Sequence, residues 1–468
     1  MKVRSFTFMR RLMMKLKAIS VAALALVALS AGATDLLEVW QAASAHDPEV
    51  AISQAARAAG LARREQSSAL WRPMVQVEGG VGAMNSHSET TGANFSAPGL
   101  GQSNGVGFNT SVNHGTSTSL SLSARQPLIN RERSAQSRQL EISADAAELE
   151  WQSSHQDLML HTAQRYFDVL LAQRRVDLLQ QQSQAVDKAL AEAKDRFALG
   201  DTPITDTHEA SARSQALRSQ WLGAQSELQI AQTALDDATG LVSPKLQPLS
   251  AEASVDTDNL APLPHWRALA LGQNPLLRMQ MAKAQAAHEE ARKFSAAGGA
   301  TLDLVAQAGQ QRLSGNGDFG AASNGQHQQM IGVQLTIPLY TGGYRSARQD
   351  EALRLEDKAQ AEVERTRQQI NQQTQAAWLG LRTGTARISA LAGSLQATRS
   401  RLDATRLGRQ VGDRTTLDLL NAENDASSAE LALLQARVDV MLSQLRLEAL
   451  AGQLDESRLA PLNAQLQH

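Results

Sequence analysis

The chain has 468 residues, a net charge of −2, only 4% aromatic residues and no cysteine. So few aromatic residues argue against several ordinary compact cores, and the abundance of alanine, glutamine, leucine and arginine is typical of long packed helices. The missing cysteine excludes disulfides, thiolate metal sites, a cysteine nucleophile and a lipid-anchored N-terminal cysteine. Without a broadly basic surface, nucleic acid is not expected as a partner.

The first 33 residues predict a secretory signal peptide. Six lysine and arginine residues precede the apolar run "AISVAALALVAL", and the small residues "SAGA" follow it, so cleavage is expected after Ala33. An uncleaved membrane anchor is the alternative, and the short apolar run and the small residues after it disfavour that alternative. Loss of the six positive charges leaves the exported chain, residues 34–468, with a net charge of −8.

The next segment, residues 34–250, is predicted to hold a helix, two strands, a long helix and a short helix, in that order. The strands are indicated by alternation: Val75, Val77 and Val81 fall on one face. A stretch rich in glycine, serine and asparagine, residues 85–117, is expected to form an exposed loop between the strands. The expected bounds are 36–71 for the first helix, 73–84 and 116–126 for the strands, 131–199 for the long helix and 206–239 for the short helix.

The remaining residues repeat the same order, which predicts a tandem duplication with a second repeat at 251–460. Pro127 matches Pro338 at an offset of 211 residues, and Gly200 matches Gly412 at an offset of 212. Asp47-Pro48 likewise matches Asn274-Pro275. The expected bounds are 265–294 for the helix, 301–313 and 328–340 for the strands with an exposed loop at 314–326, 343–411 for the long helix, 416–451 for the short helix, and 461–468 for a C-terminal tail.

The strands limit how such a chain could enter a membrane. After the signal peptide no apolar run is long enough for a membrane-spanning helix, so insertion would require a β-barrel. Four strands cannot close a barrel, since transmembrane barrels begin at eight strands and an open sheet leaves backbone groups unpaired. Identical copies related by cyclic symmetry must therefore pool their strands, giving eight in a dimer or twelve in a trimer.

Three segments of the sequence carry a family resemblance: "IPLYTGGYRSARQDEA", "VGDRTTLDLLNAENDASSAELALLQARVDVMLSQLRLEALAG" and "LGDTPITDTHEASAR". They resemble the TolC family of outer-membrane channels for drug efflux and type I protein secretion, and the similarity runs from Leu36 to Leu459. The resemblance implies a mainly α-helical fold with a membrane β-barrel. Specifically, it implies a homotrimer in which a 12-stranded barrel in the outer membrane continues into a 12-helix tunnel across the periplasm.

The resemblance also implies a gate at the periplasmic end of the tunnel. Asp418 matches the first of two carboxylates in the family's acidic ring, whereas Asn421 stands at the second position and removes one negative charge per chain. Arg414 matches a basic residue that holds the coil closed, and Thr205 with Asp206 matches its partners. Two departures from the family pattern accompany these matches: Arg409 replaces an aromatic residue of the same contact, and Phe294 to Leu304 lacks the usual proline.

These residues also have a purely structural interpretation. Thr202-Pro203 resembles a helix N-cap followed by proline at the first helical position, and Asp206 and Asp418 fall in first turns, where carboxylates complement the helix dipole. Both interpretations stay open for Asp206, and the gate is favoured for Asp418. Gly200 and Gly412 are expected to end helices.

The favoured function is a passive outer-membrane exit duct, not an enzyme, which requires no cofactor and no metal. The expected partners are two further copies of the chain, outer-membrane lipid, a periplasmic adaptor (membrane fusion) protein and an inner-membrane pump of the ABC or RND type. A periplasmic coiled-coil scaffold without a pore is the alternative, and a selective porin is a weaker third. The exposed apolar strand faces separate these classes, because lipid is their only obvious partner.

Overall fold

The computed structural model describes residues 33–99, 101–250, 253, 260–295, 299–318 and 320–466. Of the predicted signal peptide, residues 1–33, all but Ala33 lie outside these residues. The chain forms two compact units, and each is built from separate stretches of sequence. The first unit contains Met1–Ile52, Ser154–Ala270 and Gln372–His468, and the second contains Ser53–Ser153 and Leu271–Asn371.

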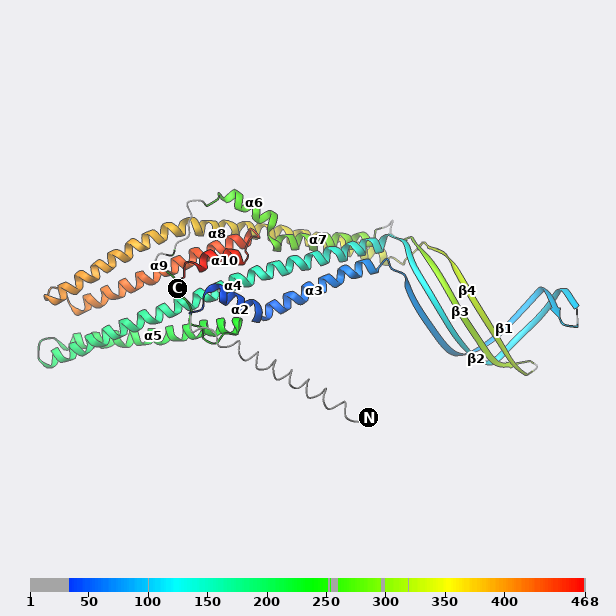
Figure 1. The fold of residues 1–468 in the computed structure, drawn as a ribbon, viewed down its shortest axis with the longest axis horizontal. Helices are drawn as coiled ribbons and strands as arrows, with labels where there is room; N and C mark the ends of the chain where they lie inside the picture. Colours follow the sequence, from blue (N-terminus) through cyan, green and yellow to red (C-terminus); the bar gives the residue numbers. More distant parts are fainter. Residues whose placement is uncertain are drawn as a thin grey trace, which may run out of the picture. The chain divides into compact units, whose positions relative to one another are not determined.

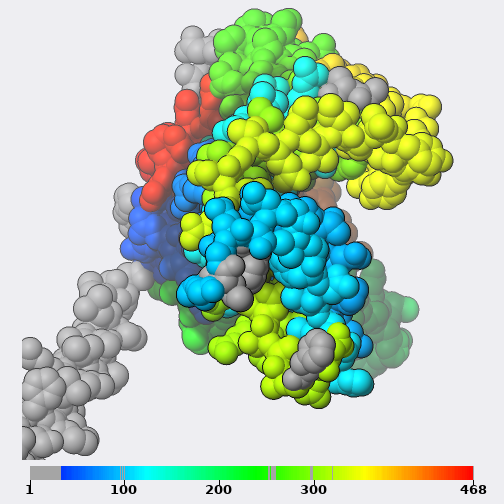
Figure 2. Space-filling model, turned by 90° about the vertical axis from the view of Figure 1, so that its right-hand side faces the viewer, coloured from blue at the N-terminus to red at the C-terminus, as the bar shows by residue number. Residues whose placement is uncertain are grey.

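The second unit contains a four-stranded antiparallel sheet in the order β1-β2-β3-β4 (Figure 1). In Figure 2 the residues of β1 and β2 (blue to cyan) lie beside those of β3 and β4 (yellow-green). Because β2 pairs with β3, the sheet joins the strands of the two sequence repeats. The strands are β1 (Met74–Ala97), β2 (Gly101–Asn130), β3 (Thr301–Gly317) and β4 (Gly320–Thr336).

The strands continue through most of the two segments predicted as exposed loops, 85–117 and 314–326, so that prediction is wrong. Pairing extends to Ala97 opposite Gly101 in the first hairpin and to Gly317 opposite Gly320 in the second. The backbone hydrogen bonds between strands form whether or not one face is apolar. Serine, threonine and asparagine on both faces of these segments remove the alternation of apolar and polar residues from which a strand is predicted. At its other end β4 stops at Thr336 instead of residue 340, before Pro338, which has no N–H for pairing.

The two faces of the sheet differ in chemistry. One face carries apolar side chains that are largely exposed: Val81 is 80% exposed, and Ile331 is 78% exposed. The register places Ala306 opposite Ile331 and Leu304 opposite Val333 on this face. We call it the apolar face. The opposite face carries mainly polar residues, including the serines of β2 at alternate positions, and we call it the polar face.

Short helices precede each pair of strands, and each predicted helix is divided in two. The predicted helix 36–71 is broken at Asp47, and the predicted helix 265–294 is broken at Asn274. Both residues precede proline and are extended, with ψ of 126° and 121°, because the proline ring disfavours the α-helical conformation of the residue before it. The observed helices are α2 (Leu36–His46), α3 (Pro48–Ala69), α6 (Leu263–Gln273) and α7 (Pro275–Lys293).

Four longer helices make up most of the rest of the chain. They form two helix–turn–helix hairpins, in each of which a helix of nearly 70 residues is followed by one about half as long. No helix among the described residues is both long enough and apolar enough to cross a membrane. The first hairpin consists of α4 (Arg131–Ala198) and α5 (Ile204–Thr239), and the second of α8 (Tyr344–Gln410) and α9 (Thr416–Leu450).

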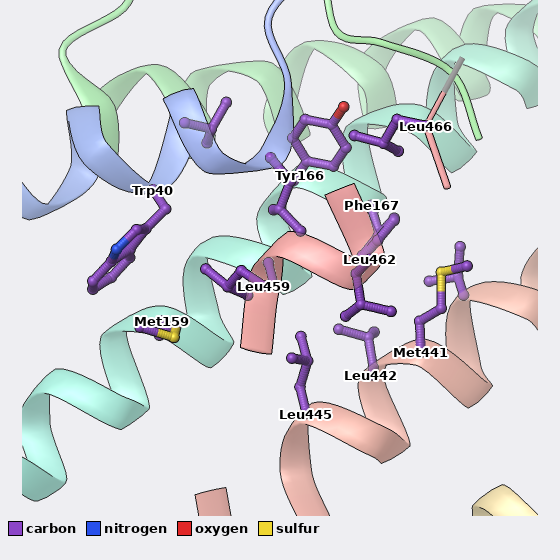
Figure 3. Packing of buried hydrophobic residues seen from close by; sticks show 14 of the residues in the cluster. Trp40, Met159, Tyr166, Phe167, Met441, Leu442, Leu445, Leu459, Leu462 and Leu466 are labelled. Carbon is purple, nitrogen blue, oxygen red and sulfur yellow. The ribbon is translucent and has the colours of Figure 1, made fainter. Parts of the chain in front are cut away.

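The main hydrophobic core lies in the first unit, where α2, α4, α9 and the C-terminal segment meet (Figure 3). Tyr166 and Phe167 of α4 are fully buried in it, and their rings meet edge to face at 5.5 Å. The Tyr166 hydroxyl donates a hydrogen bond to the carbonyl oxygen of Gln247 at 2.9 Å. Thr34 pairs there with Leu246, so the core fixes the segment that follows α5 against the beginning of the described chain.

The C-terminal segment is part of this core and not the tail predicted for 461–468. Residues Glu456–Asn463 form α10, and Leu459, Leu462 and Leu466 are buried (Figure 3). Leu466 also forms a β-bridge with Leu249. The prediction was wrong because spaced leucines in so short a segment give little periodicity, although burial of each leucine is favourable by about 2 kcal/mol.

Glu448, near the end of α9, is a buried carboxyl group that gives a testable pH dependence. Burial raises its pKa, and its Oε2 has no hydrogen-bond partner among the described residues. Since the pKa of Glu448 is higher in the folded state than in the unfolded state, the folded protein loses stability as the pH rises above 4.5, the ordinary pKa of a glutamate. Glu448→Gln is expected to increase the free energy of unfolding at pH 7 by about 1 kcal/mol, with no increase at pH 4. The melting temperatures of the wild type and of Glu448→Gln at the two pH values test this prediction. Equal melting temperatures of the two proteins at pH 7 would contradict it.

Candidate functional site

The turns that connect the helices of the two hairpins carry the predicted gate residues. Gly200 and Gly412 have positive φ, 79° and 83°, which glycine adopts without strain. The amide of Asp201 bonds the carbonyl of Arg196 at 2.9 Å, and that of Asp413 bonds the carbonyl of Gly408 at 2.8 Å. Both long helices therefore end in the same glycine-dependent cap.

Asp418 belongs to a capping box that begins α9. Thr415 is the N-cap, and its hydroxyl accepts a hydrogen bond from the Asp418 amide at 3.1 Å. The Asp418 carboxylate accepts in return from the Thr415 amide at 3.0 Å and the Thr415 hydroxyl at 2.9 Å. These bonds from Thr415, and then the charge of Arg414, lower the pKa of Asp418. Asp418 is thus held as a carboxylate at the turn.

The corresponding turn of the first hairpin lacks this box. Its N-cap is Pro203, which makes no side-chain cap, so the prediction of an N-cap at Thr202 is wrong. Proline has no N–H, so Asp206 cannot form the bond that Asp418 makes. Among the described residues, the Asp206 carboxylate accepts a hydrogen bond only from the neighbouring Thr205 hydroxyl, at 3.5 Å, and both residues are exposed. Asp206 is therefore available to another partner.

The capping role of Thr415 can be measured. Thr415→Ala removes the side-chain acceptor of the box and is expected to cost about 1 kcal/mol locally. Amide hydrogen exchange in the first turn of α9 should become roughly fivefold faster. Thr205→Ala is the matched control, because Thr205 caps no helix and should leave exchange in α5 unchanged. Equal effects of the two substitutions would contradict the assignment.

Arg414 and Asn421 are exposed residues on either side of this box. The Arg414 side chain lies over Gly408, where an added Cβ would come within 2.7 Å of its Cγ. Asn421 follows Asp418 by three residues, so the two share one face of α9. In the described part of a single chain, no hydrogen bond or ion pair joins Arg414 to Thr205 or Asp206.

Arg409 forms an ion pair that the sequence did not predict. Its guanidinium contacts the carboxylate of Glu192, so this pair joins α8 of the second hairpin to α4 of the first. The same two hairpins also meet where Leu420 of α9 packs with Val186 and Ala189 of α4. The pair closes an apolar contact between the hairpins at their turn ends.

A second ion pair joins the hairpins farther along the helices. Glu430 of α9 binds Arg174 of α4 through Nε at 3.0 Å and Arg399 of α8 through Nη2 at 3.0 Å. Burial alone would raise the pKa of Glu430, but the bonds and charges of Arg174 and Arg399 outweigh burial and lower it. Charge pairs thus connect the two hairpins. Because half-exposed ion pairs are individually weak, they could be replaced by other contacts at a small cost in free energy.

The chemistry of these turns is electrostatic. Among the described residues, no group of three or more histidine, aspartate or glutamate side chains could hold a metal ion. Among the predicted gate residues that the structure describes, Asp418 bonds Thr415, Thr205 bonds Asp206, and Arg409 pairs with Glu192. Glu192 has no counterpart in the second repeat, where Ala404 stands at the matching position, so the repeat gave no signal for it.

Comparison with known proteins places this architecture in a family. A sequence profile described as outer membrane efflux protein matches residues 39–241 and 266–453. The chain is 26% identical over 438 residues to the outer membrane protein TolC of Escherichia coli, covering 92% of this chain and 85% of that protein. It is 28% identical over 442 residues to the proteases secretion protein PrtF of Dickeya chrysanthemi, covering 94% and 92%.

A solved structure shares the fold. The outer membrane protein VceC of Vibrio cholerae superposes with a TM-score of 0.69 at 18% identity, over 89% of this chain and 96% of that chain. The family profile spans both repeats and most of the chain, from the first turn of α2 to the residues after α9. The predicted resemblance is confirmed, and the chain belongs to the outer membrane efflux protein family.

Proposed function

We propose that this protein is the outer-membrane exit duct of a tripartite efflux or type I secretion system. The observation that carries the proposal is the apolar face of the sheet, on which valine, leucine and isoleucine side chains of all four strands are exposed. Apolar patches of this extent are uncommon on the surfaces of soluble monomers. Membership of an outer-membrane family supports lipid as the material that covers this face.

The sheet edges support assembly from identical copies. β1 and β4 are the two edge strands, and each leaves one row of backbone groups unpaired within the chain. In lipid, each unpaired backbone N–H or C=O group destabilises the sheet by roughly several kcal/mol. Pairing β4 of one copy with β1 of the next satisfies both edges, and a trimer closes a 12-stranded barrel. The same trimer supplies twelve helical rows for a tunnel across the periplasm.

The duct conducts passively and opens at the hairpin turns. Asp418, Asn421 and Asp206 line the closed end, and Arg414 reaches Thr205 and Asp206 of a neighbouring copy. The Arg409–Glu192 pair holds the second hairpin against the first. The duct opens when a periplasmic adaptor and an inner-membrane pump of the ABC or RND type bind the turns and replace these contacts with contacts of their own. The pump supplies the energy, and the chain acts without catalysis.

Two kinds of cargo are consistent with the relatives. PrtF of Dickeya chrysanthemi and AprF of Pseudomonas aeruginosa are named for secretion of proteases, whereas BepC of Brucella suis is named for efflux. We propose that the chain is exported with a signal peptide that is cleaved after Ala33, and that it is not lipidated. We further propose that it serves protein secretion or general efflux from the outer membrane.

Reconstitution in planar lipid bilayers tests this function. Protein extracted from outer membranes should give small, uniform current steps, because the trimer forms a pore that is nearly closed without its partners. Membrane fractionation of cells that express the chain provides the companion measurement. A protein recovered in the soluble periplasmic fraction, with no current in bilayers, would contradict the duct and support the scaffold without a pore.

A further inference from the structure

A hollow of about 500 Å³ lies in the sheet of the second unit, at the border of the apolar face. Seven of its nine lining residues belong, by strand register, to the same face as Leu120 and Leu122. The hollow is lined by one arginine, one histidine and two glutamines, and by no carboxylate. Its lining residues are Thr118, Ser119, Leu120, Gln310, Gln311, Arg312, Ser323, Gly325 and His327.

Two adjacent rows of the sheet build the hollow. In the first row, Arg312 of β3 lies between Thr118 of β2 and Gly325 of β4. In the next row, Gln310 lies between Leu120 and His327. A Cβ added at Gly325 would meet no atom within 4 Å. The glycine therefore leaves open space directly beside the arginine.

Among the described residues, the side-chain donors of Arg312, His327 and Gln310 have no hydrogen-bond partner, whereas Gln311 and Thr118 already donate to neighbouring groups. Arg312 is exposed and forms no ion pair among the described residues. The Thr118 hydroxyl donates a hydrogen bond to the Arg312 carbonyl oxygen at 3.3 Å, and this bond leaves the guanidinium unused. Guanidinium groups bind phosphate through two parallel hydrogen bonds, and imidazole and amide N–H groups can add further bonds.

The rows that follow are apolar except at Gln329. Beyond Gln310 the next row pairs Ala308 with Gln329, and the two rows after it pair Ala306 with Ile331 and Leu304 with Val333. A cationic hollow at the end of an exposed apolar strip matches an amphiphile with an anionic head and hydrocarbon chains. A free anion would use the hollow alone and leave the strip uncovered.

We propose that this hollow binds the phosphate of a membrane lipid, with Arg312 as the principal contact and His327 and Gln310 as additional donors. The acyl chains lie along the apolar face. The inference rests on the proposed function, because it requires that face to be in contact with lipid. It adds a defined headgroup site at the boundary between the apolar band and the strand extension that ends at Gly317 and Gly320.

Native mass spectrometry of the detergent-purified protein tests the site, with dioleoylphosphatidylglycerol and dioleoylphosphatidylcholine as probes. The wild-type protein should retain phosphatidylglycerol in preference to phosphatidylcholine. Arg312→Gln should reduce retention of phosphatidylglycerol about fivefold, as expected for one arginine at a membrane surface. Arg354→Gln, an exposed position on α8 that lies outside the sheet, controls for loss of charge and should have no effect.

A pair of glycine substitutions separates shape from charge. Gly325→Val fills the hollow and should reduce retention as much as Arg312→Gln does. Gly332→Val is the matched control, because it lies on the same strand, on the polar face, and also has no atom within 4 Å of an added Cβ. Equal retention in the Gly325 and Gly332 variants, or full retention by Arg312→Gln, would overturn the site.

Two further outcomes separate this inference from the proposed function. Inorganic phosphate at millimolar concentration should not displace phosphatidylglycerol, and displacement would show that the acyl chains contribute nothing. Wild-type protein that inserts into phosphatidylcholine vesicles but shows no headgroup preference would overturn this site alone. Failure of the wild-type protein to insert into vesicles would overturn the proposed function and this site with it.

Discussion

Arg409→Ala is expected to increase the open probability of the channel in planar lipid bilayers. The substitution removes the ion pair with Glu192 that joins the second hairpin to α4. An exposed ion pair contributes about 0.5 kcal/mol, so three copies contribute about 1.5 kcal/mol, a roughly tenfold change in the ratio of open to closed channels. The pair is solvent-accessible, so high salt should raise the open probability of the wild-type channel in the same direction.

A charge exchange provides the control for this prediction. Arg409→Glu combined with Glu192→Arg restores an ion pair in reverse order and should return the conductance toward that of the wild type. Arg414→Ser and Asp206→Ala are expected to raise conductance as well, because they remove the contact proposed between neighbouring copies. Unchanged conductance in both of these variants would contradict the gate, and failure of the exchange to restore closure would contradict the role of Arg409.

Ile331→Lys is expected to prevent stable membrane insertion, whereas Met330→Lys is expected to be tolerated. The two residues are adjacent on β4 and both are exposed, at 78% and 47%, but they lie on opposite faces of the sheet. A lysine that faces lipid near the middle of the membrane costs about 2–4 kcal/mol per copy. On the polar face the same lysine faces water and costs little.

This pair separates lipid contact from ordinary exposure. The amount of trimer that resists extraction by urea from outer membranes should fall sharply for Ile331→Lys and stay near the wild-type amount for Met330→Lys. In a water-soluble scaffold both lysines would be solvated equally. Equal amounts of the two variants in the membrane fraction would therefore contradict the lipid assignment of the apolar face.

The sequence predicted the elements whose signal is local and periodic. The alternation of Val75, Val77 and Val81 marked β1, and long proline-free runs marked α4 and α8. It did not predict the outer parts of the strands, because polar residues on both faces carry no alternation. It also extended helices through Asp47 and Asn274, although the proline that follows each residue is a local signal for a break.

The predicted gate residues show a similar limit. Asp418 could be placed at a helix start from the spacing of Thr415 and Asp418, which is that of a capping box. The partner of Arg409 could not be predicted, because its contact with Glu192, 217 residues away in sequence, depends on how the two hairpins pack together. Cross-helix pairs of this kind leave no pattern in either helix alone.

The account depends on identical copies joining their sheet edges within lipid. Light scattering combined with size-exclusion chromatography measures this most directly, with the mature chain extracted from outer membranes in detergent and the detergent mass subtracted. The account predicts a protein mass of three chains and loss of solubility when detergent is removed. A monomer that stays soluble in plain aqueous buffer would contradict it.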